Sequence, residues 1–391
     1  MSRREDIVRW LEMGLEAVDP ERLTREALEP ASGPLTVLAI GKAAAAMCRG
    51  AESAVGRVDG LCITSQQERV PEGVELIIGD HPLPGEASLA AGLRAIDASS
   101  QTEVALISGG GSSLCEVPAD GLTIEFVADV YEKLLDAGTS IAEVNLVRAH
   151  LSKTKGGGLG PIPTYVISDV GGAGTDVVSS GPTIGIAPAA DRVIEIMRHV
   201  GVRLDTSIEQ IVHSHNRVSR PSPEVFVLAD GKTAAKGVAM AAVGDEVQAR
   251  VKPGWIEGDL LEGLSDFVGS AHRGVTVAAG EPSVPADPQG RGGRNTHAAL
   301  TAARMIEGTN ALFAALATDG VDGRSDSAGA IVDGSTLTRG GEPSSALARY
   351  DSASYLEATD DLIQTGPTGT NVADLWLIWK PEDGPEPILS V

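Results

Sequence analysis

The chain has 391 residues, of which 54 are Asp or Glu and 31 are Lys or Arg, so its formal net charge is −23. This charge argues against a nucleic acid or an anionic membrane surface as the main partner, because both require clustered cations. Hydrophobic residues make up 42% of the chain, an ordinary globular value that excludes general disorder.

Cysteine content and hydropathy indicate the compartment. The three cysteines, Cys48, Cys62 and Cys115, are too few and too scattered for a disulfide framework or a CxxC metal site. No apolar run reaches the roughly 18 residues of a membrane helix, and the N-terminus lacks the apolar segment of a signal peptide. We therefore expect a cytoplasmic protein with no membrane segment.

The hydrophobic pattern predicts an α/β fold. Ile7, Leu11, Leu15 and Val18 recur at helical spacing and predict an amphipathic helix over residues 4–18. After that, short apolar runs end in glycine or a small polar residue, and helix-like segments often follow. The runs cover residues 35–41, 74–80, 103–111, 164–172, 224–231, 274–281, 311–320 and 373–379. Such runs are typical of strands covered on both faces, and their alternation with helices predicts parallel sheets.

A domain boundary is expected near residues 215–223, where the polar segment NRVSRPSPE contains two prolines. It divides the chain into a Rossmann-like, doubly wound N-terminal domain over 1–222 and a smaller α/β domain over 223–391. Ligands of open α/β sheets bind beyond the carboxyl ends of the strands, so the residues that follow the runs are the candidates for chemistry.

The segment SGGGSSL (108–114) follows one apolar run. Backbone N–H groups of Gly109, Gly110 and Gly111 can converge on an anion, and the Ser112 hydroxyl adds a donor. The alternative is a tight turn with a helix cap. Neither the GxxxxGK[ST] phosphate loop nor a GxGxxG dinucleotide fingerprint after a strand occurs in the chain.

Two cations stand out at strand and helix ends. Lys42 follows the run at 35–41 and begins an alanine-rich helix, which indicates an anionic partner, since a helix N-terminus disfavours a cation. Arg294 lies with Arg291 in the loop GRGGRN, and arginine forks bind carboxylate or phosphate. The alternatives are a surface lysine and a solvated, charged loop.

Two aspartates and a threonine-rich turn complete the set. Asp169 and Asp319 follow apolar runs, where a carboxylate suits Mg²⁺ ligation or proton removal from a hydroxyl. Ordinary acidic turns are the alternative. TGPTGTN (365–371) is either a second phosphate cradle or a plain turn. Cations, anion cradles and carboxylates together suit phosphoryl transfer.

At these residues the sequence resembles the glycerate 2-kinases of the MOFRL type, over nearly the whole chain. Eight blocks in one order carry the resemblance. They are GKAA (41–44), GDHPLPGEAS (79–88), SGGGSSL (108–114), NLVRAHLSKTKGGGL (145–159), SDV…SSGPT (168–183), GRGGRN (290–295), TDGVDG…SAGAIVD (318–333) and TGPTGTNV (365–372).

The resemblance implies two α/β domains with the active site in the cleft between them. It implies transfer of the ATP γ-phosphoryl group to the 2-hydroxyl of D-glycerate, with Mg²⁺. The implied catalytic residues are Lys42, Arg294, Asp169 and Asp319, and the two aspartates are also the implied metal ligands. The implied binding residues are Gly109, Gly110, Gly111, Ser112, Lys155, Thr368 and Asn371.

The chain also departs from the family pattern. Two family aspartates are replaced by Ala173 and Gly174, and the block after GGRN reads Thr296-His297. Three alternatives therefore stay open: a hydroxypyruvate reductase, a kinase for another small 2-hydroxy acid, or a non-catalytic paralogue that binds nucleotide or acid. The missing dinucleotide fingerprint counts against the reductase. A homodimer is also left open.

Overall fold

The computed structural model describes residues 2–29, 31, 33–171, 174–215, 223–284 and 290–381. The chain forms two compact units. The N-terminal unit contains Pro20–Asp169 and Ala173–Leu228, and the C-terminal unit contains Met1–Asp19, Val170–Gly172 and Ala229–Val391. Most of the expected boundary segment, residues 216–222, lies outside the described residues. The first 19 residues differ from the expected division, since they pack with the C-terminal unit.

The N-terminal unit is built on a six-stranded sheet in the order β3-β2-β1-β4-β5-β6. The strands are β1 (Leu35–Ile40), β2 (Val58–Thr64), β3 (Gly73–Ile78), β4 (Val104–Ser108), β5 (Thr164–Ile167) and β6 (Val225–Ala229). Pairing from β3 through β5 is parallel. This is the strand order of a Rossmann fold, so the predicted doubly wound sheet is confirmed.

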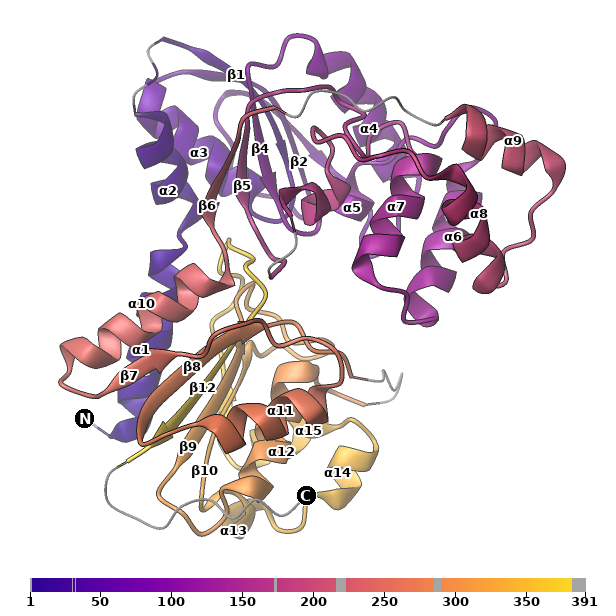
Figure 1. Cartoon of the computed structure of the whole chain (residues 1–391). Helices are drawn as coiled ribbons and strands as arrows, with labels where there is room; N and C mark the ends of the chain where they lie inside the picture. Colours follow the sequence, from indigo (N-terminus) through magenta and orange to yellow (C-terminus); the bar gives the residue numbers. More distant parts are fainter. Residues whose placement is uncertain are drawn as a thin grey trace. The chain divides into compact units, whose positions relative to one another are not determined.

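Helices cover both faces of this sheet. Helix α3 (Ala44–Val55) packs on β1, β2 and β4, and α2 (Pro20–Leu28) lies against α3. Helix α4 (Glu86–Ser99) packs on β1, β2 and β3 from the other side of the sheet (Figure 1). The chain leaves β1 through α3 in one direction and enters β4 from α4 in the other. The neighbouring ends of β1 and β4 therefore form the topological switch point, where ligands of such sheets bind.

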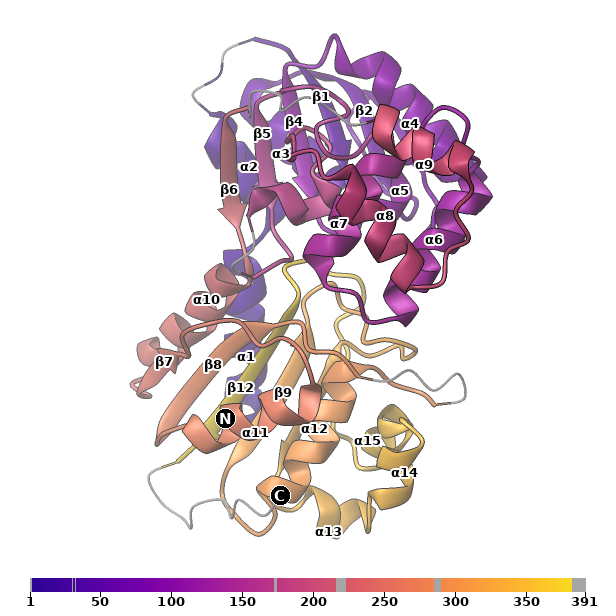
Figure 2. The ribbon, with the colours of Figure 1, turned by 45° about the vertical axis from the view of Figure 1, so that its right-hand side comes forward.

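A layer of helices with its own core extends the N-terminal unit, and these helices lie together in Figure 2. They are α6 (Ile124–Asp136), α7 (Ile141–Leu151), α8 (Ala190–His199) and α9 (Thr206–Ser214). The 3-10 helix η1 (Thr175–Ser180) contacts α7 and the short α5 (Gly111–Leu114). Thr123 and Ser140 cap α6 and α7 by accepting backbone N–H bonds. Apolar side chains such as Val147 and Met197 fill the space between the helices.

The C-terminal unit has a second six-stranded sheet, in the order β11-β10-β9-β12-β8-β7. Its strands are β7 (Ala249–Val251), β8 (Gly274–Gly280), β9 (Leu312–Ala317), β10 (Gly329–Asp333), β11 (Leu362–Ile363) and β12 (Asp374–Lys380). The parallel pairing predicted for it is wrong for most neighbours, because β10 and β12 run antiparallel to β9. The segments 318–328 and 364–373 contain no crossover helix that could return the chain in parallel.

Helices also cover both faces of the second sheet (Figure 1). Helices α1 (Arg3–Ala17) and α10 (Gly231–Gly244) pair over one face. The other face carries α11 (Leu260–Ser270), α12 (Arg294–Met305), α13 (Thr336–Gly340), α14 (Ser344–Ala348) and α15 (Ser352–Ala358). Phe267, Phe313 and Trp376 meet edge to face in the core beneath α11 and α12. None of the described helices is long and apolar enough to cross a membrane.

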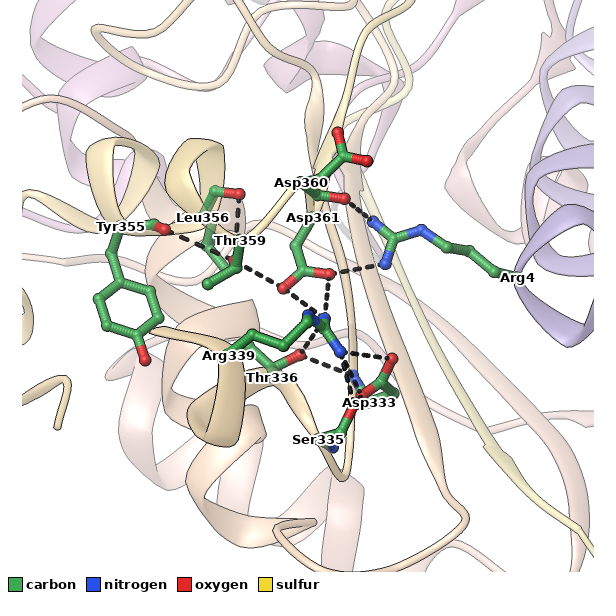
Figure 3. A network of polar contacts seen from close by, with 10 residues as sticks. All are labelled: Arg4, Asp333, Ser335, Thr336, Arg339, Tyr355, Leu356, Thr359, Asp360 and Asp361. Atoms are coloured by element: carbon green, nitrogen blue, oxygen red, sulfur yellow. Dashed lines mark hydrogen bonds and ion pairs between the residues drawn. The ribbon is translucent and has the colours of Figure 1, made fainter. Parts of the chain in front are cut away.

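The predicted first helix is confirmed, and polar contacts explain its place in the C-terminal unit. Arg4 of α1 donates to Asp361 at 2.6 Å, and Arg339 donates to the same fully buried carboxylate at 2.7 Å. Figure 3 shows the two arginines reaching Asp361 from different sides. The Trp10 and Trp379 rings also lie 5.0 Å apart. A buried carboxylate shared by two arginines fixes α1 on this unit.

Candidate active site

Lys42 is anchored at the switch point of the first sheet. Gly41 has a φ of +128°, and a Cβ there would lie 2.4 Å from the Ser108 carbonyl oxygen, so β1 and β4 can approach only at a glycine. The Lys42 N–H donates to the Gly109 carbonyl oxygen at 2.9 Å, and the Ala43 N–H donates to Ser108 Oγ at 3.0 Å. The end of β1 is therefore bonded directly to the start of the glycine-rich loop.

The Lys42 side chain lies along that loop. Gly110 has a φ of +84°, and a Cβ on it would lie 2.9 Å from Lys42 Cγ and 3.4 Å from Cδ and Cε. Only a residue without a side chain leaves room for the lysine stem here. The structure thus brings together Lys42 and the loop Gly109–Ser112, which were predicted from separate motifs.

Ser179 and Ser180, which were not among the predicted site residues, bond to the other end of the loop. Ser179 Oγ accepts the Gly111 N–H at 3.0 Å and donates to the Ser108 carbonyl at 2.5 Å. Ser180 Oγ lies 2.9 Å from Ser112 Oγ. Both serines have positive φ, 51° and 61°, a strained conformation typical of functional sites. In the sequence, both serines belong to the SSGPT part of one family block, and the resemblance implied no role for either hydroxyl.

Lys155 donates hydrogen bonds to the backbone at the end of the loop. Its side chain is 1% exposed, and Nζ donates to the carbonyl oxygens of Cys115, at 2.7 Å, and Gly111, at 3.2 Å. Burial lowers the pKa of Lys155, against the raising effect of the nearby Glu116 carboxylate. These contacts fix both ends of α5. Anion binding by Lys155 stays a prediction.

A buried polar cluster of Glu116, Tyr131 and Arg148 adjoins Lys155, and the sequence analysis assigned none of these three residues to a site. Tyr131 donates its hydroxyl to Glu116 Oε2 at 3.0 Å, and the Arg148 guanidinium lies over the Tyr131 ring, 5.1 Å from its centroid. Burial raises the pKa of Glu116 and lowers the pKa of Arg148. These residues lie on or between helices, so a search at strand ends misses them.

In the C-terminal unit, the antiparallel register creates the surroundings of Arg294. Asp374 pairs with Gly280 on one side and with Ala317 on the other. The start of β12 therefore lies beside the carboxyl ends of β8 and β9. Arg294 begins α12 at this edge of the sheet.

Two carboxylates hold Arg294 there. Its Nε donates to Asp374, and its Nη2 lies 3.0 Å from Glu281 Oε1. Nη1 has no hydrogen-bond partner within the part of the chain that the structure describes, and about a third of the side chain is exposed. Burial raises the pKa of Asp374 to about 6, although Arg294 and Asn295 favour the carboxylate form. Neither Asp374 nor Glu281 was selected from the sequence, because each stands at a strand end without a motif.

A third carboxylate orients the helix that carries Arg294. Asp322 accepts the N–H groups of Asn295, at 2.9 Å, and Thr296, at 2.7 Å. The Thr296 hydroxyl in turn accepts the Gly293 N–H at 3.0 Å. Thr296, one of the departures from the family pattern, therefore completes the cap of α12. These bonds satisfy orphan N–H groups and fix the direction of the arginine.

Asp319 and the threonine-rich turn lie together at the same edge. The Thr368 N–H donates to the Asp319 carbonyl at 3.3 Å, and the Thr368 hydroxyl donates to the Thr318 carbonyl. Asp319 Oδ1 accepts the Val321 N–H at 3.1 Å, a contact that also fits the acidic turn considered as the alternative for this residue. The Asn371 side chain accepts the Ala373 N–H at 3.4 Å. Asp319, Thr368 and Asn371 thus share one loop cluster.

Asp169 follows β5 and belongs to the N-terminal unit, whereas Asp319 belongs to the C-terminal unit. Ala173, one replacement of a family aspartate, lies outside the described residues, as does the side chain of Asp176. In the described ranges, no three or more His, Cys, Asp or Glu side chains are grouped so that they could hold a metal. Mg²⁺ often uses only one or two carboxylates together with substrate phosphates, so the metal role of the two aspartates stays a prediction.

Comparisons with known proteins agree with this architecture. Residues 6–213 match the family model of a domain of unknown function (DUF4147), and residues 274–374 match the MOFRL family. The glycerate 2-kinase of Pyrococcus horikoshii is 31% identical, with 95% of this chain and 96% of that protein covered. The D-glycerate 2-kinase of Thermotoga maritima is 30% identical, covering 92% and 94%.

A relative with another name is also similar. A putative hydroxypyruvate reductase of Agrobacterium vitis is 34% identical over 88% of this chain and 98% of its own length. The crystal structure of glycerate kinase from Thermotoga maritima superposes with a TM-score of 0.84 at 28% identity, covering 96% of this chain and 98% of that one. The chain belongs to the family of MOFRL-type glycerate 2-kinases.

Proposed function

We propose that this protein is a kinase that transfers the γ-phosphoryl group of ATP to the 2-hydroxyl of D-glycerate, giving 2-phosphoglycerate and ADP. The observation that carries the proposal is the position of Lys42. It lies against Gly110 of a glycine-rich loop, at the switch point of a Rossmann-ordered sheet. A cation fixed beside such a loop suits the charge that spreads over phosphoryl oxygens in the transition state.

The proposed roles follow the chemistry of each residue. Lys42 and Arg294 stabilise the transferring phosphoryl group or hold the acid, and Asp169 or Asp319 accepts the proton of the 2-hydroxyl. That oxygen then bonds to the γ-phosphorus while the bond to ADP breaks. The loop Gly109–Ser112, Lys155 and the turn with Thr368 and Asn371 are assigned to binding of the nucleotide and acid oxygens.

Mg²⁺ is part of the proposal as the partner of ATP. The donors fit this ion, since Asp169 and Asp319 offer hard carboxylate oxygens at strand ends and Mg²⁺ prefers such ligands. When bound, Mg²⁺ would neutralise phosphate charge. A cytoplasmic location also belongs to the proposal.

A reductase acting on hydroxypyruvate is the second candidate, because relatives carry that name. The first strand-to-helix turn argues against it. In dinucleotide-binding folds this turn reads GxGxxG and approaches the pyrophosphate closely. Here the same turn reads GKAAAAM, and the Lys42 side chain follows its glycine.

The test is ADP release from Mg·ATP in the presence and absence of D-glycerate, with a separate assay of NAD(P)H consumption with hydroxypyruvate. We expect glycerate-dependent ADP release and no NAD(P)H consumption. Consumption of NAD(P)H without ADP release would replace the kinase with the reductase. If neither occurs in a folded sample, the kinase proposal for D-glycerate is wrong.

A further inference from the structure

We propose that Arg148 forms an oxyanion-binding subsite behind Ser112, which takes the carboxylate of the hydroxy acid or a phosphoryl group of the nucleotide. The inference rests on the proposed function for the identity of the two ligands. It adds a substrate-binding residue that lies on α7, away from every strand end. All of its parts belong to the N-terminal unit.

The first observation is a buried guanidinium that forms no direct ion pair with a described residue. Arg148 is 8% exposed, and its Nε has no hydrogen-bond partner. Its Nη1 makes only long contacts, 3.5 Å to Asn145 Oδ1 and 3.4 Å to Ser180 Oγ. No described Asp or Glu forms an ion pair with it. A buried charge left in this state is costly unless a ligand of opposite charge completes the site.

The second observation is the charge balance around it. Arg148, Lys155 and Glu116 are all buried, which sets two cations against one carboxylate. Glu116 Oε1 has no hydrogen-bond partner, and its other oxygen is taken by Tyr131. Neither cation forms a direct ion pair with Glu116, although this carboxylate favours the charged form of both. One carboxylate cannot balance two cations, so the cluster keeps an excess positive charge. In a chain of net charge −23, such a local excess is a means to attract an anion.

The third observation connects the guanidinium to the glycine-rich loop. Ser180 Oγ contacts Arg148 Nη1, donates to Asn145 Oδ1 at 2.8 Å, and lies 2.9 Å from Ser112 Oγ. Ser112 is half-buried, whereas Ser180 and Asn145 are buried. One hydroxyl therefore separates Arg148 from a loop residue already assigned to binding. An oxyanion bound at Ser112 would accept hydrogen bonds that the linked side chains of Ser112, Ser180 and Arg148 leave unmade.

The residue type fits the ligand. A guanidinium presents a planar fork that matches the paired oxygens of a carboxylate or phosphate, and it stays charged when buried. Tyr131 supports the guanidinium with its ring face and leaves the edge, which carries the N–H donors, for other partners. Both substrate oxyanions share this chemistry, so the experiment must separate them.

The test compares wild type with Arg148→Met and Arg148→Lys. Each purified protein is melted alone and with D-glycerate, Mg·ATP or inorganic phosphate, and KM is measured for both substrates. Arg192→Met is the matched control, because Arg192 forms an exposed ion pair with Glu143 of the same helix α7. That control should behave as wild type, since exposed pairs contribute little.

We expect Arg148→Met to be no less stable than wild type without ligand, because removal of an uncompensated buried charge relieves a desolvation cost. It should raise KM for one substrate about 10- to 100-fold, because a pair of charge-assisted hydrogen bonds is lost. The KM for the other substrate should stay unchanged. A raised KM for D-glycerate assigns the carboxylate, and a raised KM for ATP assigns the phosphoryl group. Arg148→Lys should recover only part of the loss, since it lacks the fork.

Other outcomes overturn the inference. Destabilisation of the unliganded Arg148→Met protein with both KM values unchanged would make Arg148 a structural residue. Ligand-induced shifts in melting temperature equal to those of wild type would also reject the subsite. If wild type shows no turnover, the proposed function fails. Phosphate and D-glycerate melting shifts still test the subsite in that case, and their absence in wild type would reject it.

Discussion

Arg294 is half-buried in the C-terminal unit and Arg148 is buried in the N-terminal unit, and the two arginines differ in their partners. Arg294 contacts Asp374 and Glu281, so its charge is balanced before any ligand arrives. Arg148 has a tyrosine face and long contacts to neutral oxygens, so its charge is not balanced. A balanced cation is held in one orientation, whereas an unbalanced cation is ready to bind an anion. The comparison predicts that the two arginines respond oppositely to removal.

The largest effect is expected for Arg294→Ala. Loss of a cation at the transferring group should reduce kcat/KM by about 10²–10³. Removal also leaves Asp374 buried without its counterion, which should lower the free energy of unfolding by about 2 kcal/mol, a value discounted because Arg294 is one-third exposed. Steady-state kinetics and chemical denaturation measure the two effects separately.

Arg291→Ala is the control for this variant. Arg291 belongs to the same loop but pairs with Glu357 on the surface, so its removal should change stability by less than about 1 kcal/mol. If Arg294→Ala matches the activity and stability of Arg291→Ala, the balanced-cation description of Arg294 is wrong.

Lys42→Met tests the other proposed catalytic cation. We expect kcat to fall by about 10²–10³, because the charge beside the glycine-rich loop is lost. The melting temperature should stay close to that of wild type, since methionine preserves the stem packed along Gly110. Lys153→Met, which removes an exposed pair with Asp120, is the matched control. Near-normal turnover by Lys42→Met would remove this lysine from the mechanism.

Gly110→Ala tests the contact between loop and lysine. The new Cβ would lie 2.9 Å from Lys42 Cγ, so the lysine must move, and a displaced catalytic group can reduce kcat by about 10- to 100-fold. Gly138→Ala is the control, because Gly138 also has positive φ but would have no atom within 4 Å of its Cβ. Equal activity of the two variants would show that the contact between Gly110 and Lys42 does not control turnover.

The smallest effect concerns pH. Asp374 has a pKa of about 6 in the folded protein against an ordinary 3.8. Between these values the unfolded chain loses its proton first, so the folded state binds more protons and the free energy of unfolding falls as pH rises. Asp374→Asn should abolish this contribution, which denaturation at pH 4, 5 and 6 would detect. An unchanged slope in the variant would mean that another group titrates.

The sequence predicted the parts of the site that depend on strand ends. Lys42 and Gly109–Ser112 each follow an apolar run, so periodicity predicted that each lies at the end of a strand. The structure adds that the two strands, β1 and β4, are neighbours. It could not predict that Asp374 balances Arg294, because this pairing requires the antiparallel β12, and an apolar run does not show its direction. Arg148 was missed for another reason, since it lies in the family block at 145–159, which gave no role to an arginine within a helix. The proposed role of Arg148 depends on its lack of a direct ion pair with the described residues, and this can be seen only in the folded structure.

The sequence also could not predict to which unit the first helix belongs. The spacing of its apolar residues predicts a helix but not its partner. Contacts with Asp361 and Trp379, more than 350 residues further along the chain, attach this helix to the C-terminal unit. Local pattern thus specified the element, and long-range polar and aromatic contacts specified its place.

The identity of the product tests the proposed kinase activity most directly. Purified protein incubated with Mg·ATP and D-glycerate would be followed by phosphorus NMR, in which proton coupling separates the two phosphoglycerates without added enzymes. We expect a 2-phosphoglycerate signal in wild type and its near absence in Lys42→Met. A 3-phosphoglycerate signal would contradict the proposed regiochemistry, and no phosphorylated acid from a folded sample would contradict the kinase itself.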